Sequence, residues 1–179
     1  MEFTTYKWTN TEYRYGIDIP DPNFFHYLTT TYDLVVDQGG KISFEDTFRI
    51  TEIDCPHRGI KTFAGIEFFP NLTYLNCGWN PLERLDLWNN RKLQLMSCLG
   101  CGLTELNVAD CYFLSVLNCS LNNLQSLKLD CCYSLRFLFC SHNRLKELDV
   151  TTCSDSIEVD HEGNSDLLEI AHTVEQRST

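Results

Sequence analysis

The sequence predicts an α/β solenoid: repeated units that stack a parallel sheet on the concave side, with little helix on the convex side and a short helical N-terminal cap. Two recurring columns of residues support this fold class. The first is a comb of cysteines spaced by 22, 21, 21 and 21 residues: Cys55, Cys77, Cys98, Cys119 and Cys140. The second is a column of asparagines: Asn80, Asn122 and Asn143. A fixed period of this length is typical of repeat architectures.

Cutting the chain at this period gives units of 21 residues that begin at Asn71, Lys92, Phe113 and Ser134. Two less regular copies flank them. Residues 49–70 carry one additional residue, and residues 155–170 carry His161 in place of the cysteine while Val159 and Asn164 keep their places. The repeats therefore extend over most of the chain.

Each unit follows the pattern L-x-x-L-x-C-x-x-N-x-L-x-x-L-x-L. Because one unit cannot bury its apolar side alone, the units are expected to stack and share a continuous core. Leucine and cysteine alternate, so both point inward from a short strand. The asparagines, replaced once by Cys101, are expected to bind main-chain groups at the turn. The second half of the unit is too short for a helix and has strand-like alternation.

The 21-residue unit with a cysteine on its strand resembles the leucine-rich repeats of bacterial internalin-like proteins. The segment at residues 65–72 (GIEFFPNL) also resembles the way those arrays begin, and the resemblance covers roughly residues 49–154. It implies a leucine-rich repeat arc. For function it implies only a binding role, because such repeats serve almost any binding task.

Three segments are expected: an N-terminal cap at residues 1–48, about five to six repeats at residues 49–170, and an acidic tail at residues 171–179. A solenoid needs caps because its terminal units expose core residues. Within the first cap, Asp21 followed by Pro22 predicts the start of a helix, with aspartate as the N-cap and proline at the first helical position.

Residues 35–46 resemble an EF-hand calcium loop, with Gly40 at its sixth position. Such a loop supplies oxygen ligands from positions one, three, five and twelve. Those positions hold Val35, Asp37, Gly39 and Asp46. Two of them have no side-chain oxygen, and the last is shorter than the usual glutamate. We therefore interpret the loop as vestigial and predict neither a metal ion nor another cofactor.

The charge balance excludes several function classes. Lys plus Arg is 14 and Asp plus Glu is 25, which gives a net charge of −11. Binding to nucleic acid or to an anionic membrane needs a basic face, so neither partner is expected. No stretch approaches the roughly 20 apolar residues of a membrane-spanning helix. The first ten residues lack the basic start and apolar run of a secretory signal, which predicts a cytoplasmic protein, with secretion or surface attachment as the alternative.

Residues with catalytic or metal-binding chemistry are dispersed. Cys98 and Cys101 have the spacing of half a zinc site, but no second pair matches it. The five histidines form no sequence motif with a nucleophile, and no glycine-rich phosphate loop is present. We therefore predict that the chain is not an enzyme. In a reducing cytosol the second cysteine column would stay as free thiols: Cys111, Cys132 and Cys153.

The candidate binding site is the solvent-facing surface of the concave strands, where apolar and aromatic residues replace the usual polar ones and acids lie at both ends. An exposed apolar patch with a polar border marks an interaction site, and aromatic residues are its usual anchors. The predicted partner-binding residues are Tyr74, Trp79, Leu95, Leu99, Val116, Leu121, Phe137, Phe139, His142, Glu52, Asp54, Glu158 and Asp160. Alternatively, a cap, a loop or a second copy covers this patch, or β-propensity alone explains these residues.

These features favour a non-catalytic recognition module that binds another protein on its concave face. The acidic flanks favour a basic partner, since complementary potential speeds the encounter. One hypothesis is an immunity or inhibitor protein that occludes a basic toxin or effector. The alternative is an exported adhesion or structural repeat domain of a bacterial surface protein, as the resemblance would imply. An enzyme that uses Cys98 or His142 would require a strongly reactive thiol.

Overall fold

The computed structural model describes residues 16–171 of the 179-residue chain. The first ten residues, on which the expectation about a secretory signal rests, lie outside this range. So does the expected acidic tail, apart from Ala171.

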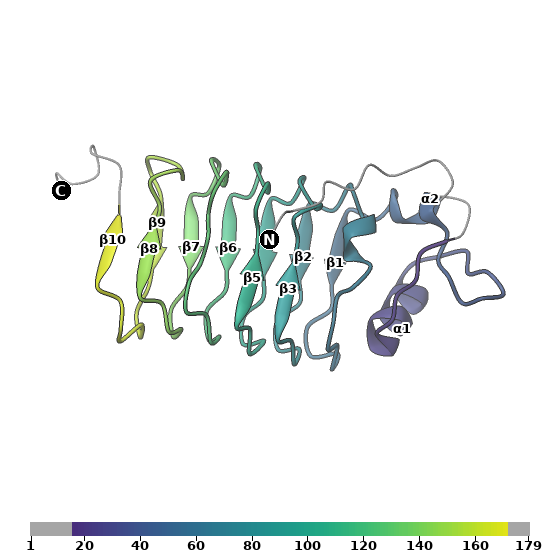
Figure 1. Cartoon of the computed structure of the whole chain (residues 1–179). Helices are drawn as coiled ribbons and strands as arrows, with labels where there is room; N and C mark the ends of the chain where they lie inside the picture. The colour runs from purple at the N-terminus through teal and green to yellow at the C-terminus, as the bar shows by residue number, and fades with distance from the viewer. Residues whose placement is uncertain (1–15, 172–179) are drawn as a thin grey trace, which may run out of the picture.

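The described chain winds into stacked coils with strands on two opposite walls (Figure 1). One wall is a continuous six-stranded parallel sheet, here called the six-stranded face. Its strands, in spatial order, are β1 (Glu52–Asp54), β2 (Tyr74–Asn76), β4 (Leu95–Ser97), β6 (Val116–Asn118), β7 (Phe137–Phe139) and β9 (Glu158–Asp160). The predicted solenoid, with a parallel sheet along one side and little helix, is confirmed.

The opposite wall is discontinuous. It consists of two parallel pairs: β3 (Arg84–Asp86) with β5 (Glu105–Asn107), and β8 (Glu147–Asp149) with β10 (Glu169–Ala171). Residues 126–128, at the same place in the coil between the two pairs, form no strand, and an open pocket of about 350 Å³ lies beside them. The outward side chains of this wall are mostly charged and exposed.

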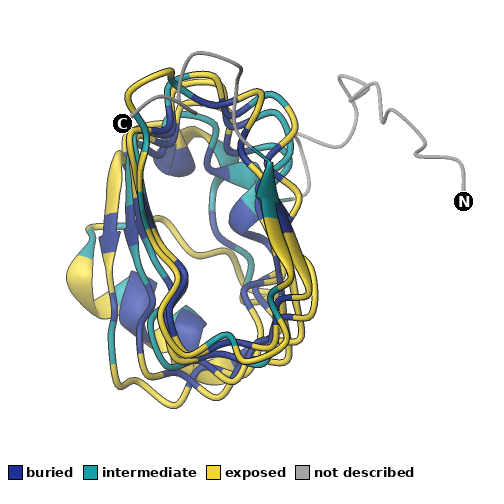
Figure 2. Ribbon diagram, turned by 90° about the vertical axis from the view of Figure 1, so that its left-hand side faces the viewer, coloured by how far each residue is buried: buried dark blue, intermediate teal, exposed yellow. Residues whose placement is uncertain are grey.

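The core is one continuous cluster of buried residues, and the view along the coil shows buried residues on both walls (Figure 2). In each regular unit the central strand residue and the cysteine that follows point inward, as Leu75 and Cys77 do at 0% exposure. The five cysteines of the comb are all fully buried, which agrees with the expected inward column. Cysteine behaves here as a small hydrophobic residue.

The asparagine column ties successive coils together. The Asn122 side chain accepts hydrogen bonds from the main-chain N–H groups of Cys101 (3.1 Å) and Leu103 (2.9 Å) in the preceding coil. Its amide donates to the carbonyls of Cys98 and Cys119, both at 2.9 Å. Three other asparagines make corresponding contacts: Asn80, Asn143 and Asn164. These bonds satisfy buried main-chain groups, as the sequence predicted.

Helix α1 (Pro22–Thr31) begins where the sequence placed it. The Asp21 carboxylate accepts hydrogen bonds from the N–H groups of Asn23 (2.9 Å) and Phe24 (3.0 Å). Phe24 packs against the first coil, with its ring centre 4.7 Å from that of Phe63. The one-turn helix α2 (Phe44–Thr47) and the short 3₁₀ helix η2 (Ile66–Phe68) complete the entry to the array.

The carboxylates of the EF-hand-like loop accept hydrogen bonds from main-chain N–H groups. Asp37 accepts hydrogen bonds from the N–H groups of Gly39 (2.8 Å) and Lys41 (2.9 Å). Asp46, at the twelfth position, accepts one from the N–H group of Val35 (2.6 Å) and forms an ion pair with Arg49. The loop thus uses these carboxylates as structural acceptors.

Candidate protein-binding face

One row of outward side chains crosses the six-stranded face from end to end. The parallel register places these residues beside one another, strand by strand: Glu52, Tyr74, Leu95, Val116, Phe137 and Glu158. We call this row the apolar ladder, because its four central members are apolar or aromatic. Leu95 is 42% and Phe137 is 37% exposed, and the glutamates at both ends are exposed as well.

A second, more polar row runs beside the apolar ladder: Asp54, Asn76, Ser97, Asn118, Phe139 and Asp160. Two of its asparagine side chains already form hydrogen bonds with nearby groups of the chain. Asn76 donates to the Asp54 carboxylate (2.9 Å) and accepts from the Gly78 N–H (3.2 Å), and Asn118 accepts from the Ser120 N–H (3.1 Å). Phe139 extends the apolar area toward the C-terminal end, where it is 39% exposed.

Three of the predicted binding residues, Trp79, Leu121 and His142, lie at the turn beyond the strands, which corrects their sequence-based placement on the strands. They form a row with His57 and Gly100, and all five residues have left-handed backbones. The physical reason is that each strand is only three residues long, so the chain must turn before the buried asparagine. Sequence alternation alone does not reveal a positive φ at a residue such as tryptophan, which seldom adopts it.

Aromatic rings cover part of this turn. The rings of His57 and Trp79 stack with centres 5.8 Å apart and planes 8° from parallel. Trp79 also lies against Gly100, where an added Cβ would be 2.7 Å from the indole ring. Leu99 is half-buried beside them, and its carbonyl accepts the Trp79 N–H at 2.8 Å. The structure thus places the predicted residues along one wall and its edge, with Leu99 the least accessible of the aliphatic residues at that edge.

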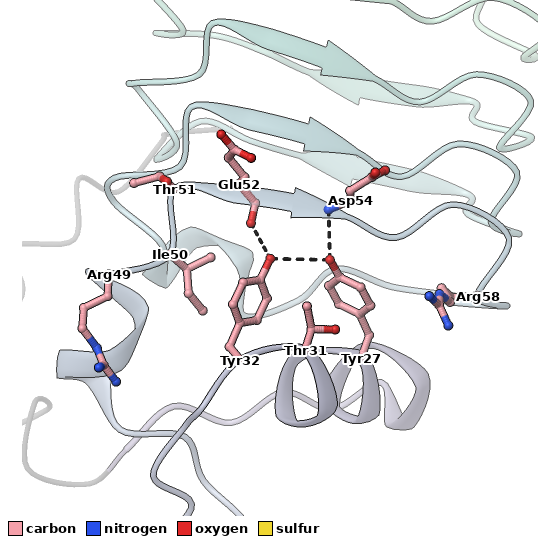
Figure 3. A pocket seen from close by; sticks show the side chains of 9 residues that line it. All are labelled: Tyr27, Thr31, Tyr32, Arg49, Ile50, Thr51, Glu52, Asp54 and Arg58. Atoms are coloured by element: carbon pink, nitrogen blue, oxygen red, sulfur yellow. Dashed lines mark hydrogen bonds between the residues drawn. The ribbon is translucent and has the colours of Figure 1, made fainter.

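Two tyrosines, one on α1 and one just after it, meet the outer edge of β1 at the N-terminal end of this face (Figure 3). The Tyr32 hydroxyl donates to the Glu52 carbonyl (2.5 Å), and the Tyr27 hydroxyl accepts from the Asp54 N–H (3.0 Å). Burial raises the pKa of Tyr32, so its hydroxyl stays protonated and able to donate. The tyrosines line an open pocket of about 510 Å³ and take the place of a neighbouring strand.

The opposite end of the face is acidic and has no described strand beyond it. Strand β9 pairs only with β7, and Glu158 and Asp160 project from it. Glu162, just after the strand, is also exposed. The central residue of this strand, Val159, is half-buried, whereas its counterpart Leu138 in the preceding coil is fully buried.

Burial keeps the cysteines of the comb in the thiol form. Nine of the ten cysteines are buried, and Cys131 is half-exposed. Burial raises the pKa of Cys98 well above its ordinary value and raises that of Cys55 to about 12. A nucleophilic cysteine needs a lowered pKa, so Cys98 does not fit the enzyme hypothesis.

Among residues 16–171, no group of three or more histidine, cysteine or acidic side chains is arranged to hold a metal ion. Within the same range, no helix has the length and apolar character needed to cross a bilayer.

Sequence reasoning missed a second exposed aromatic cluster, which lies at an outer corner of the coil. The rings of Tyr112 and Tyr133 stack with centres 6.4 Å apart, and Phe113 is exposed beside them. The signal was present, because the two tyrosines are separated by one repeat length of 21 residues.

Comparison with known proteins gives similarity at the level of the fold. No protein-family model matches the chain, and no curated protein matches it. Solved structures do match it, among them three from Listeria monocytogenes. The functional domain of InlJ, described as including a cysteine ladder, is 24% identical over 68% of this chain and 32% of its own, with a TM-score of 0.47.

The two other structures are the internalins InlF and InlC2. InlF is 18% identical over 85% of this chain and 56% of its own, with a TM-score of 0.51. InlC2 is 16% identical over 89% of this chain and 90% of its own, with a TM-score of 0.54. The chain therefore spans less than two thirds of the length of InlJ and InlF.

Proposed function

We propose that this chain, which has the internalin-like leucine-rich repeat fold, is a non-catalytic recognition module that binds another protein on its six-stranded face. The observation that carries the proposal is the apolar ladder on a hydrogen-bonded sheet: among its central side chains Leu95 and Phe137 are exposed, and Tyr74 and Val116 are half-buried. Contiguous apolar patches on soluble proteins usually serve an interaction. Tyr74 and Phe137, near the two ends of the apolar segment, are the expected anchors, because aromatic residues dominate interface energetics.

The charges around the ladder favour a basic partner. Glu52 and Asp54 lie at one end of the face, and Glu158 and Asp160 lie at the other. The whole chain carries a net charge of −11, which would steer a cationic protein toward it. Occlusion of a basic toxin or effector, as by an immunity protein, would use this face directly.

An exported adhesion or structural repeat domain is the second candidate. It is favoured by the structural similarity to InlF and InlC2, which are internalins. The two candidates differ in the expected redox state of the cysteines. A count of ten free thiols on protein isolated from its native source under alkylating conditions would favour the intracellular inhibitor. Oxidised thiols would favour export.

The test of the face pairs two double variants. Tyr74→Ala with Phe137→Ala removes both anchors of the apolar ladder, whereas Tyr112→Ala with Tyr133→Ala removes exposed rings from the outer corner. A partner captured from the native organism should be retained by the wild type and by the corner variant. With that partner purified, we expect the ladder variant to bind about tenfold or more weakly. Unchanged affinity in a ladder variant with wild-type circular dichroism would reject the proposal.

A further inference from the structure

The spacing of acids and apolar side chains on the six-stranded face specifies the shape of the element that fits it. We infer that the partner docks through an α-helix lying across the strands, with an apolar stripe along one side and a lysine or arginine near each end. This inference rests on the proposed function and adds the chemistry of the docking element.

The length of the helix follows from the strand spacing. Glu52 and Glu158 are separated by five steps between neighbouring strands, and at about 4.8 Å per step the distance is roughly 24 Å. A helix rises 1.5 Å per residue, so about 16 residues cover that distance. The four apolar members of the ladder span about 14 Å, or roughly three helical turns. Apolar residues three and four apart would supply the matching stripe.

The main chain of the face argues for a helix and against an extended peptide. The N–H and C=O groups of the inner strands are bonded to neighbouring strands, and the side-chain oxygens of Asn76 and Asn118 already accept nearby main-chain N–H groups. An extended segment laid across these strands would lose water from its backbone without gaining partners, which is costly. A helix satisfies its own backbone. At the β1 edge, the tyrosine hydroxyls already take the place that an added strand would need.

The acids of the six-stranded face determine which charges the ends of the partner's helix should carry. The apolar ladder and the polar row beside it carry four acids and no basic residue, and the acids lie only on β1 and β9. Cationic side chains at both ends of a helix would therefore meet opposite charge, while a helix with acidic ends would be repelled.

The experiment uses synthetic helical peptides of about 18 residues and the full chain, with binding followed by fluorescence anisotropy. One peptide carries a leucine stripe with lysines near each end, about 14 residues apart, and a second carries glutamates in place of those lysines. We expect the lysine peptide to bind, and the glutamate peptide to bind about tenfold or more weakly. Leu95→Ala should weaken binding of the lysine peptide.

Charge variants then locate the binding site. Glu52→Gln and Glu158→Gln should each weaken binding of the lysine peptide about threefold, as expected for exposed charge pairs. Glu83→Gln and Glu147→Gln are matched controls, because both side chains are exposed away from the six-stranded face. These controls change the net charge equally and should leave the affinity unchanged.

Several outcomes would overturn the inference: no binding of the lysine peptide, equal binding of both peptides, or equal effects of the face and control variants. An extended peptide serves as a third probe: if it bound more tightly than the lysine peptide and Leu95→Ala left its binding unchanged, the helix inference would be wrong and strand addition at β9 would be indicated instead. If the native partner still requires Tyr74 and Phe137 while the lysine peptide fails to bind, the helix inference is wrong and the proposed function stands.

Discussion

At the scale of single residues, asparagine and cysteine replace one another in two of the inward columns. In the asparagine column Cys101 replaces asparagine, and its thiol donates to the Cys77 carbonyl at 3.2 Å. In the column of Cys111, Cys132 and Cys153, Asn90 holds the equivalent position one repeat earlier, and its amide donates to the Ile66 carbonyl at 2.9 Å. The Cys111 thiol reaches the Leu87 carbonyl at 3.7 Å. Both residue types thus bond a carbonyl of the preceding coil, and asparagine also offers an acceptor.

Because asparagine bonds more main-chain groups than cysteine does, we expect the stability of the fold to be most sensitive to substitutions in the asparagine column. Asn122→Ala would leave two N–H groups and three carbonyls of the core without this partner. Since each unpaired buried group costs about 1–3 kcal/mol, we expect a loss of at least about 3 kcal/mol in the free energy of unfolding, measured in urea. Asn123→Ala is the control, because its amide makes one exposed contact at 3.3 Å and should cost less than about 1 kcal/mol. Equal losses of stability in the two variants would contradict the role assigned to the asparagine column.

At the scale of elements, the strands were predictable and the turns after them were not. A strand residue such as Leu75 repeats with the period of the chain, and inward and outward positions alternate, so its burial follows from the sequence. The left-handed backbone at Trp79 has no such signal. It is imposed by the need to turn within a few residues and to place the Asn80 amide against the coil before it.

The contact that closes the outer edge of β1, here called the seal, also could not be predicted, because it joins residues with no periodic relation. Tyr27 and Tyr32 lie on and just after α1, and their hydroxyls meet main-chain groups 27 and 20 residues away. Periodicity identifies what the coils share, whereas a cap contact occurs once. The sequence therefore indicated that a cap was needed and where its helix began, but not which side chains close the sheet.

Removing these hydroxyls tests the seal. Tyr27→Phe would leave the Asp54 N–H unpaired, and Tyr32→Phe would leave the Glu52 carbonyl unpaired. We expect each to lower the free energy of unfolding by about 1–2 kcal/mol in chemical denaturation. Tyr112→Phe makes the same chemical change at an exposed hydroxyl bonded to Asp110, and should cost almost nothing. If all three variants had equal stability, the tyrosines would not be sealing the edge.

At the scale of the whole molecule, the core is built from residues that recur from unit to unit, whereas the candidate site is built from outward residues that differ between units. The cysteine comb and the leucine columns recur in nearly every unit and could be located from spacing alone. The acids at β1 and β9 break the apolar ladder at its two ends, and the register confirms that they share its row. Which partner uses that row is not encoded in the repeat, because many ligands suit one scaffold.

The stacked thiols give the molecule a stability that depends on pH. Burial raises the pKa of Cys55, Cys111, Cys132 and Cys140 to about 12, from an ordinary value near 9. These thiols remain protonated in the folded chain and ionise in the unfolded chain as soon as the pH exceeds about 9. Their contribution is therefore complete below pH 9 and is lost progressively as the pH rises toward 12.

One pH unit above the unfolded pKa, each such thiol should lower the free energy of unfolding by about 1.4 kcal/mol, so several together should produce a steep decline. Urea unfolding with a reducing agent at pH 8, 9 and 10 measures it. The Cys140→Ala variant is the control: it is less stable at pH 8, because a buried group is lost, but its stability should fall less between pH 9 and 10, since one ionising group is missing. Equal pH dependence in both proteins, or no decline in either, would show that these thiols are not held neutral by the fold.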